Sequence, residues 1–358
     1  MKLLDINKLR NISVAFFTLI ILTFSGTAKA EKAPEEHAEE EHGGEFQAGE
    51  MIMHHITDSH IWEFWHGANW YLPVILYDFE EGVKIFSSKN FVTHGGEYMG
   101  YEIHHDDIHS VEGNKILDIS ITKNVAMMLI STTLLIVIFL ITSNQYKKNK
   151  KAPKGVAALL EPVVLYVRDE IARPSIGHKY EKFMPFLLTI FFYILVNNLL
   201  GLFPGAGNVT GNIAVTMTLA LFTFIMTNIN GTKDYWRHIF NTPGVPWWLK
   251  FLIPIMPIVE FIGLFTKPFS LMIRLFANIT AGHIIILSII SLIFIFESVF
   301  ISPVSILLGA FMNILELLVA FIQAYVFTLL SALYFGGAAE EHEHEHGQEE
   351  LQESKALV

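Results

Sequence analysis

The sequence contains no cysteine, which excludes disulfide frameworks, thiolate metal sites and iron–sulfur clusters. Charge is also scarce, because Asp, Glu, Lys and Arg make up 16% of the 358 residues, whereas soluble domains carry about 25%. There is no glycine-rich phosphate-binding loop with its lysine, so nucleotide chemistry is not expected in this chain. Hydrophobic residues make up 52% and gather in runs near membrane-spanning length, which predicts an all-α polytopic membrane protein.

Residues 1–30 have the three-part pattern of a secretory signal peptide. A basic start containing Lys2, Lys8 and Arg10 precedes a short apolar core at 12–24, and the sequence Ala-Lys-Ala at Ala28–Ala30 fits a cleavage site. The apolar core is too short to span a bilayer comfortably, which favours cleavage over an uncleaved signal anchor. Under either interpretation, the segment that follows lies outside the cytoplasm.

Two different segments precede the first span. Residues 31–69 are acidic and rich in histidine, and this composition predicts disorder. Residues 70–122 contain short β-like runs separated by glycines, which predicts a small strand-containing domain on the outer face. The three runs are Pro73–Asp78, Val83–Ser87 and Lys115–Ile121.

Residues 123–336 are predicted to form the membrane domain, and the acidic residues 337–358 a cytoplasmic tail. Lys147–Lys154 and the loop 231–250 mark the cytoplasmic side, because cytoplasmic loops are rich in Lys and Arg. About five spans are expected, and an outside start then requires an inside end. They are Asn124–Thr142, Phe183–Phe203, Ile213–Ile229 and two long antiparallel helices, Val259–Phe296 and Pro303–Phe335.

Connections between the spans carry further expectations. The mixed apolar and charged spacing of Val156–Arg173 predicts an interfacial helix. Pro254 and Pro257 interrupt the apolar segment 251–258, which predicts a short bent start to the fourth span. The outer turn is placed at Glu297–Ser302, and Gly336-Gly337 is interpreted as the end of the last helix.

Arg274 is the charged residue that an apolar span should not contain. An arginine at mid-bilayer costs at least about 2.5–3.5 kcal/mol, and it cannot release its proton to avoid that cost. It also lies too far from either helix end to reach the interface easily. We interpret Arg274 as functional; the alternative is a structural ion pair with a buried carboxylate. At about 100° per residue, the same helix face carries a polar stripe formed by Glu260, Lys267, Ser270, Arg274 and Asn278.

The last helix supplies a polar face to match, which carries Asn313, Glu316, Gln323 and Tyr334. If Gln323 lies level with Arg274 in an antiparallel pair, His283 lies about 13.5 Å further out and Glu316 about 10.5 Å. The two side chains then share nearly the same depth. A His and a Glu that meet there can pass protons; the alternative is a purely structural hydrogen-bonded pair.

These residues carry a family pattern. Lys267–Asn278 closely resembles the signature helix of subunit a of the bacterial F-type ATP synthase, and Gln323–Phe327 resembles that family's final helix. Pro185–Pro204, with Asn198, is similar to its second span, and Val215–Met217 to the start of its third. The resemblance covers roughly residues 156–336 and leaves the outer domain unexplained.

The resemblance implies a role for each matching residue. Arg274 would be the fixed stator charge, supported by Asn278 and Gln323. His283 stands where bacterial members often have Glu, and Glu316 where they often have His, so the pair is exchanged between the helices. Gly201 occupies a position that is acidic in some members, and no channel role is assigned to it.

The mechanism implied is that of a non-catalytic, proton-translocating stator subunit with two offset half-channels. The inner path would include Ser270 and Glu260, and the outer path Asn278, His283, Glu316 and Gln323. The partners implied are a ring of rotor proteolipids, peripheral-stalk subunits and a soluble nucleotide-binding head, in a bacterial inner membrane. No cofactor and no nucleic acid is implied.

Two alternatives compete with this interpretation. A stand-alone secondary transporter is less favoured, because the sequence shows no internal repeat. A metal-binding outer domain is also less favoured, because the histidines have no predictable geometry and a solvated polar surface explains them. These histidines are His54, His55, His104, His105 and His109.

Overall fold

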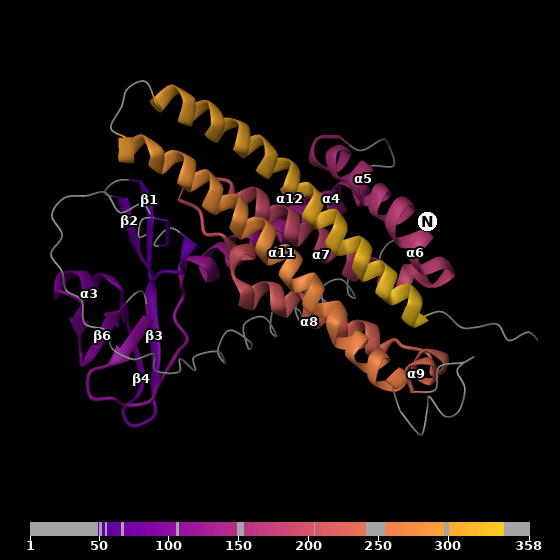
Figure 1. The fold of residues 1–358 in the computed structure, drawn as a ribbon, viewed down its shortest axis with the longest axis horizontal. Helices are drawn as coiled ribbons and strands as arrows, with labels where there is room; N and C mark the ends of the chain where they lie inside the picture. The colour runs from indigo at the N-terminus through magenta and orange to yellow at the C-terminus, as the bar shows by residue number, and fades with distance from the viewer. Residues whose placement is uncertain are drawn as a thin grey trace, which may run out of the picture.

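The structure is a computed structural model that describes residue 49 and residues 52–53, 56–65, 68–104, 107–148, 154–203, 205–240, 255–296 and 301–339. The predictions for the signal segment, the cytoplasmic tail, residues 31–48, residues 251–254 and most of the outer turn lie outside the described residues. The described part is mostly helical, with a strand-containing domain at one end of a group of helices (Figure 1).

The outer domain contains short antiparallel strands and one short helix. Its elements are β1 (Ile61–Trp65), β2 (Ala68–Tyr71), β3 (Pro73–Asp78), β4 (Gly82–Ser87), α3 (Lys89–Thr93), β5 (Glu97–Tyr98), β6 (Tyr101–His104), β7 (Asp107–Ser110) and β8 (Ile116–Asp118). β1 pairs with β2, and two three-stranded sheets have the orders β4-β3-β8 and β5-β6-β7. Alternate residues of β3 point inward, and they build a small core of Val74, Leu76, Phe91, Tyr101 and Ile108.

All three predicted strands are present, as β3, β4 and β8. The structured domain begins earlier than expected. β1 lies within residues 31–69, for which composition predicted disorder, so the structured domain starts before residue 70. The hairpin of β1 and β2 has little core of its own. Trp62 instead lies in the core of the membrane domain, which supplies the burial that a short two-stranded hairpin lacks.

The membrane domain is built from helices. They are α4 (Lys123–Lys148), α5 (Val156–Tyr166), the π-helical η1 (Val167–Ala172), α6 (Arg173–Ile176), the 3₁₀ turn η2 (Gly177–Lys179), α7 (Tyr180–Gly201), the 3₁₀ turn η3 (Val209–Gly211), α8 (Ile213–Ile229), α9 (Lys233–Phe240), α11 (Ile255–Phe296) and α12 (Ile301–Ala339). Among the described residues, four helices are long and apolar enough to cross a membrane, or five if the bent pair of α8 and α9 forms one span. This range includes the predicted count of five.

α7 lies at the centre, and α11 and α12 lie at the side. Nearly every residue in the middle of α7 is buried, and Phe183 and Phe186 pack on Phe335 of α12 with ring centroids 4.8 and 5.4 Å apart. α11 and α12 run antiparallel and side by side, as predicted (Figure 1). Only 11% of the most apolar stretch of α11 is buried inside the protein, so one long face of this helix is open.

Both long helices extend beyond their predicted ends. α11 begins at Ile255, because Pro257 falls in the first turn, where a missing N–H group costs nothing. α12 continues through Gly336-Gly337 to Ala339, so these glycines do not end the helix. Gly336 instead brings α12 against the backbone carbonyl of Ser175, where a Cβ atom would not fit. The carbonyl oxygens of the last turn accept from Thr232 N (2.9 Å) and Lys179 Nζ (3.3 Å).

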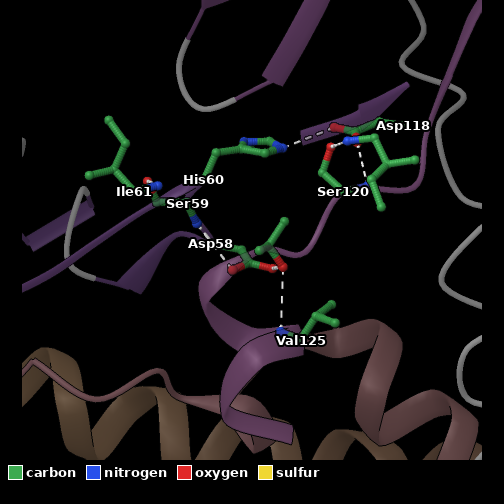
Figure 2. Close-up of polar contacts among 9 residues, drawn as sticks. Asp58, Ser59, His60, Ile61, Asp118, Ser120 and Val125 are labelled. Atoms are coloured by element: carbon green, nitrogen blue, oxygen red, sulfur yellow. Dashed lines mark hydrogen bonds and ion pairs between the residues drawn. The ribbon is translucent and has the colours of Figure 1, made fainter. Parts of the chain in front are cut away.

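The outer domain is joined to the start of α4 by a polar network (Figure 2). The Asp58 carboxylate accepts from the backbone N–H of Asn124 (2.9 Å) and the hydroxyl of Thr122 (2.7 Å). It therefore satisfies a free N–H group at the helix N-terminus and complements the helix dipole. His60 contacts Asp118 at 3.0 Å. Burial raises the pKa of the Asp118 carboxyl, but the bonds from His60 and Ser120 outweigh it, so the net shift is downward.

Candidate functional site

Arg274 lies close to the middle of α11, on its open face. Its side chain is exposed, as are Ser270 and Asn278 one turn to either side. Among the described residues, Arg274 makes no hydrogen bond and no ion pair. The structural alternative, a buried carboxylate that neutralises the arginine, is therefore not found in this part of the chain.

The surroundings of Arg274 are apolar. The open face of α11 exposes Phe265, Phe269 and Ile273, and the neighbouring face of α12 exposes Leu318 and Ile322. A long apolar face of this kind is suited to contact with lipid or with another membrane helix. The guanidinium is thus a positive charge in the middle of a largely apolar surface that faces outward from the protein.

His283 and Glu316 meet between α11 and α12. His283 Nδ1 is in direct contact with the Glu316 carboxyl group, and the Glu316 side chain is 6% exposed. The contact that helical geometry predicted is therefore confirmed, while the role of the pair remains a proposal. Gly282 allows the close approach, because a Cβ at this position would stand 3.3 Å from Glu316 Oε1.

The second ring nitrogen of His283 has a partner that the sequence did not reveal. His283 Nε2 lies 3.2 Å from the carbonyl oxygen of Gly201, at the end of α7. A carbonyl oxygen only accepts hydrogen bonds, so Nε2 carries a proton and Nδ1 is the nitrogen left to exchange one with Glu316. The sequence assigned no channel role to Gly201, because glycine lacks the acidic side chain that some family members have at this position. Its backbone carbonyl nevertheless orients the histidine.

Buried amide side chains lie on α7 and α12, the helices that contribute Gly201 and Glu316. Asn198 of α7 accepts from Thr210 (2.6 Å) and donates to the carbonyl of Ala320 on α12 (3.5 Å). Gln323, two turns along α12 from Glu316, is also buried. Asn313 does not lie on the buried side of α12 as expected. It is exposed, and its amide donates to the carbonyl of Gly309 in its own helix (3.4 Å). The buried polar residues therefore extend inward along α12, from Glu316 to Gln323.

A separate polar cavity lies at the other end of α11. It has a volume of about 300 Å³ and is lined by residues of α9, α11 and α12, including Asp234, His238, Glu260, Lys267 and Tyr334. The Lys267 ammonium lies 5.7 Å from the centre of the Tyr334 ring. Glu260 was predicted here, whereas Ser270 lies on the open face.

Asp234 and His238 were missed, although α9 offered a signal in its acidic start and basic end. They occupy successive turns of one helix face, and such i, i+4 spacing points both side chains in the same direction. The arrangement as a whole has a fixed charge at Arg274, a titratable pair toward the outer domain and a polar cavity toward α9. Together with the apolar helices, it defines a multi-pass membrane protein with charged and titratable groups along its longest helices.

Comparisons with known proteins identify the family. The sequence model of the family described as ATP synthase A chain matches residues 125–336, and a model described as a domain of unknown function matches residues 51–127. The chain is 50% identical over 234 residues to ATP synthase subunit a of Chloroherpeton thalassium, covering 63% of this chain and 69% of that one. It is 48% identical over 243 residues to ATP synthase subunit a 2 of Chlorobaculum tepidum, covering 66% and 67%.

A relative from a third organism shows the same relationship. The chain is 46% identical over 243 residues to ATP synthase subunit a of Myxococcus xanthus, covering 64% of this chain and 78% of that one. The protein therefore belongs to the ATP synthase A chain family. This confirms the prediction of a proton-translocating stator subunit and disfavours the stand-alone transporter.

Proposed function

We propose that Arg274 is the fixed charge past which a rotor carboxylate moves, between an outer and an inner proton path. The observation that supports this most strongly is an arginine without a partner among the described residues, exposed at the middle of an open apolar helix face. No carboxylate among the described residues neutralises it there. The neutralising carboxylate is therefore expected to arrive from a second protein.

The chemistry follows from the cost of charge in a membrane. A carboxylate in lipid favours its protonated, neutral form. Opposite Arg274 the ionised form becomes favourable, so the carboxyl group releases its proton to the inner path. After it has passed the arginine it is reprotonated from the outer path. The fixed positive charge also repels protons and so prevents direct leakage between the two paths.

The outer path is assigned to His283 and Glu316, with Asn278 and Gln323 between this pair and Arg274. The inner path is assigned to the cavity beside Glu260, to which the structure adds Asp234 and His238. Ser270 would face the rotor from the open side of α11. The two groups of residues lie toward opposite ends of α11, as separate paths to the two faces of a membrane require.

The partners follow from the same surfaces. The open face of α11 and α12 would contact a ring of rotor proteolipids, each with one membrane carboxylate. Peripheral-stalk subunits would hold the protein against that ring, and a separate soluble head would carry out the nucleotide chemistry. In this arrangement the chain has no catalytic residue of its own and needs no cofactor.

The protein is proposed to lie in a bacterial inner membrane. A cleaved signal peptide would place the outer domain on the extracytoplasmic side, and the acidic tail after Ala339 would lie in the cytoplasm. Consistent with this orientation, the outer domain lies toward the end of the helical group where α11 ends and α12 begins, and α9 lies toward the other end (Figure 1).

Replacement of Arg274 is the direct test. Arg274→Ala should abolish ATP synthesis and ATP-driven pumping together, while passive proton leak persists or rises because the electrostatic barrier is gone. Arg274→Lys keeps a charge but loses the planar guanidinium and can release its proton when buried, so it should be severely impaired as well. The measurement is proton flux with and without ATP in vesicles that contain the whole complex. ATP-driven pumping by an intact Arg274→Ala complex would contradict the assignment.

A further inference from the structure

Residues 58–62, here called the outer strap, hold the outer domain to the membrane domain at two points. At one end, Asp58 accepts from the N-terminus of α4, and Lys123 N donates to the carbonyl of Ser59 (2.8 Å). At the other end, the indole N–H of Trp62 donates to the carbonyl oxygen of Gly205 at 2.7 Å. The strap thus contacts two separate elements of the membrane domain.

Trp62 is built into the membrane domain rather than into the outer domain. Its side chain is 3% exposed and packs in the same core as residues of α4 and α7. Its cross-strand neighbour Trp70 is 62% exposed, so burial of an indole is not a general property of this hairpin. The indole N–H donates to the Gly205 carbonyl in a partly buried setting, where a carbonyl that is shielded from water gains from a protein donor.

The turn that Trp62 holds comes directly after the residue that orients His283. Gly201 ends α7, and Gly205 lies four residues further along the chain. The chain just after this turn packs closely on the start of α4, because a Cβ on Gly207 would stand 2.8 Å from Asn124 Oδ1. The turn is therefore bonded to Trp62 and followed by a residue that packs on the Asp58-capped start of α4.

These contacts connect the strap to the proposed proton pair. Trp62 bonds to Gly205, four residues after Gly201 in the chain, and the Gly201 carbonyl contacts His283 Nε2, whose ring contacts Glu316. Glu316 is the titratable group placed against His283, while Asp58, His60, Asp118 and Lys123 are the charged groups around the strap. A shift of the turn would move the carbonyl that keeps Nε2 protonated and directs Nδ1 toward Glu316.

We propose that the outer domain positions His283 for proton uptake, with Trp62 as the positioning residue. This inference rests on the proposed function of the His283 and Glu316 pair. It gives residues 51–127 a role in the reaction itself: they hold the turn whose backbone orients the proton-accepting imidazole. Trp62 touches neither the proton nor the rotor, so its effect must appear on the outer side alone.

The test uses the whole complex in vesicles, at a fixed membrane voltage. ATP synthesis is measured while the pH on the outer-domain side is varied, and then while the pH on the other side is varied. Trp62→Phe keeps an aromatic ring in the core but removes the N–H group. It should lower synthesis about two- to tenfold when protons on the outer side are limiting. It should also change the profile against outer pH and leave the profile against inner pH unchanged.

Three further variants separate the outcomes. Trp70→Phe, the same change on the partner strand, should match the wild type. Trp62→Phe in a His283→Ala background should add nothing to the outer-pH defect of His283→Ala. Asp58→Asn loosens the other end of the strap and should give the same one-sided change. It also tests the proposal if Trp62→Phe does not assemble.

Each contrary result has its own meaning. The positioning role would be overturned if Trp62→Phe kept the wild-type outer-pH profile while His283→Ala was impaired. If Trp62→Phe does not assemble, the same result in Asp58→Asn would overturn it. Equal changes on both sides of the membrane would also overturn it, because they indicate general destabilisation. Normal synthesis by His283→Ala would instead overturn the proposed function of the pair.

Discussion

At the scale of single residues, the exchanged pair on α11 and α12 can be tested by exchanging it back. His283→Leu and Glu316→Leu should each reduce proton flux by about a hundredfold, the lower end of what a positioned proton-transfer group contributes. The double exchange His283→Glu with Glu316→His should restore part of it, because the two groups still meet across the same helices. Flux through reconstituted complexes is the measurement, and normal flux in both single variants would make the pair structural only.

The outer domain contains a carboxyl group whose protonation should weaken the fold. Hydrogen bonds from the backbone of Glu80 and the Tyr101 hydroxyl hold the pKa of the Asp78 carboxyl below its usual value of 3.8, despite the opposing effect of burial. The carboxylate therefore stabilises the folded state above this value, and the contribution is lost as the pH falls below it. In the same pair, burial and then the Asp78 carboxylate raise the pKa of Tyr101 to about 12.

Pepsin digestion of the outer domain in right-side-out vesicles, between about pH 2 and 5, measures this effect. Wild type should become more susceptible as the pH falls through the lower part of this range. Asp78→Asn should be more susceptible already at the upper end and show a flatter dependence on pH. Asp107→Asn, an exposed acid of the same domain, serves as the control. Equal curves for all three proteins would exclude Asp78 as the cause.

At the scale of elements, two adjacent glycines of α12 should respond oppositely to the same change. Gly336→Ala places a methyl group against the Ser175 carbonyl of α6 and should destabilise the packing by about 1–3 kcal/mol. Gly337→Ala meets nothing within 4 Å among the described residues and should gain about 0.5–1 kcal/mol of helix stability. Thermal denaturation of the purified variants tests this, and similar midpoints for both would contradict the close contact.

The same glycines show where sequence reasoning stops. Apolar run lengths and basic flanks predicted the spans. Helical periodicity predicted that His283 meets Glu316, once Gln323 was placed level with Arg274 in an antiparallel pair. Gly336-Gly337 was misinterpreted because a distant carbonyl, not the local chain, explains it. Trp62 and the Gly201 carbonyl were missed for the same reason: their partners lie 143 and 82 residues away in the sequence.

At the scale of the whole molecule, protease accessibility tests the proposed orientation. Protease added to sealed right-side-out vesicles should cut the outer domain and spare the acidic tail 340–358. After the vesicles are permeabilised, the tail should be cut as well. A tail cut from the outside in sealed vesicles would be incompatible with five spans and an extracytoplasmic start.

The length of α11 has a consequence for rotation. Its 42 residues extend about 63 Å, twice the roughly 30 Å of a hydrocarbon core. Phe261 and Phe294 are both exposed near its ends, so an upright helix would push apolar side chains into water, and the helix must lie obliquely. Along an oblique helix, much of the distance from His283 to Arg274 runs sideways rather than through the membrane. In the proposed mechanism, a rotor carboxylate would then pass from one proton path to the other by moving along the ring's circumference, so each proton transferred would be coupled to a step of rotation.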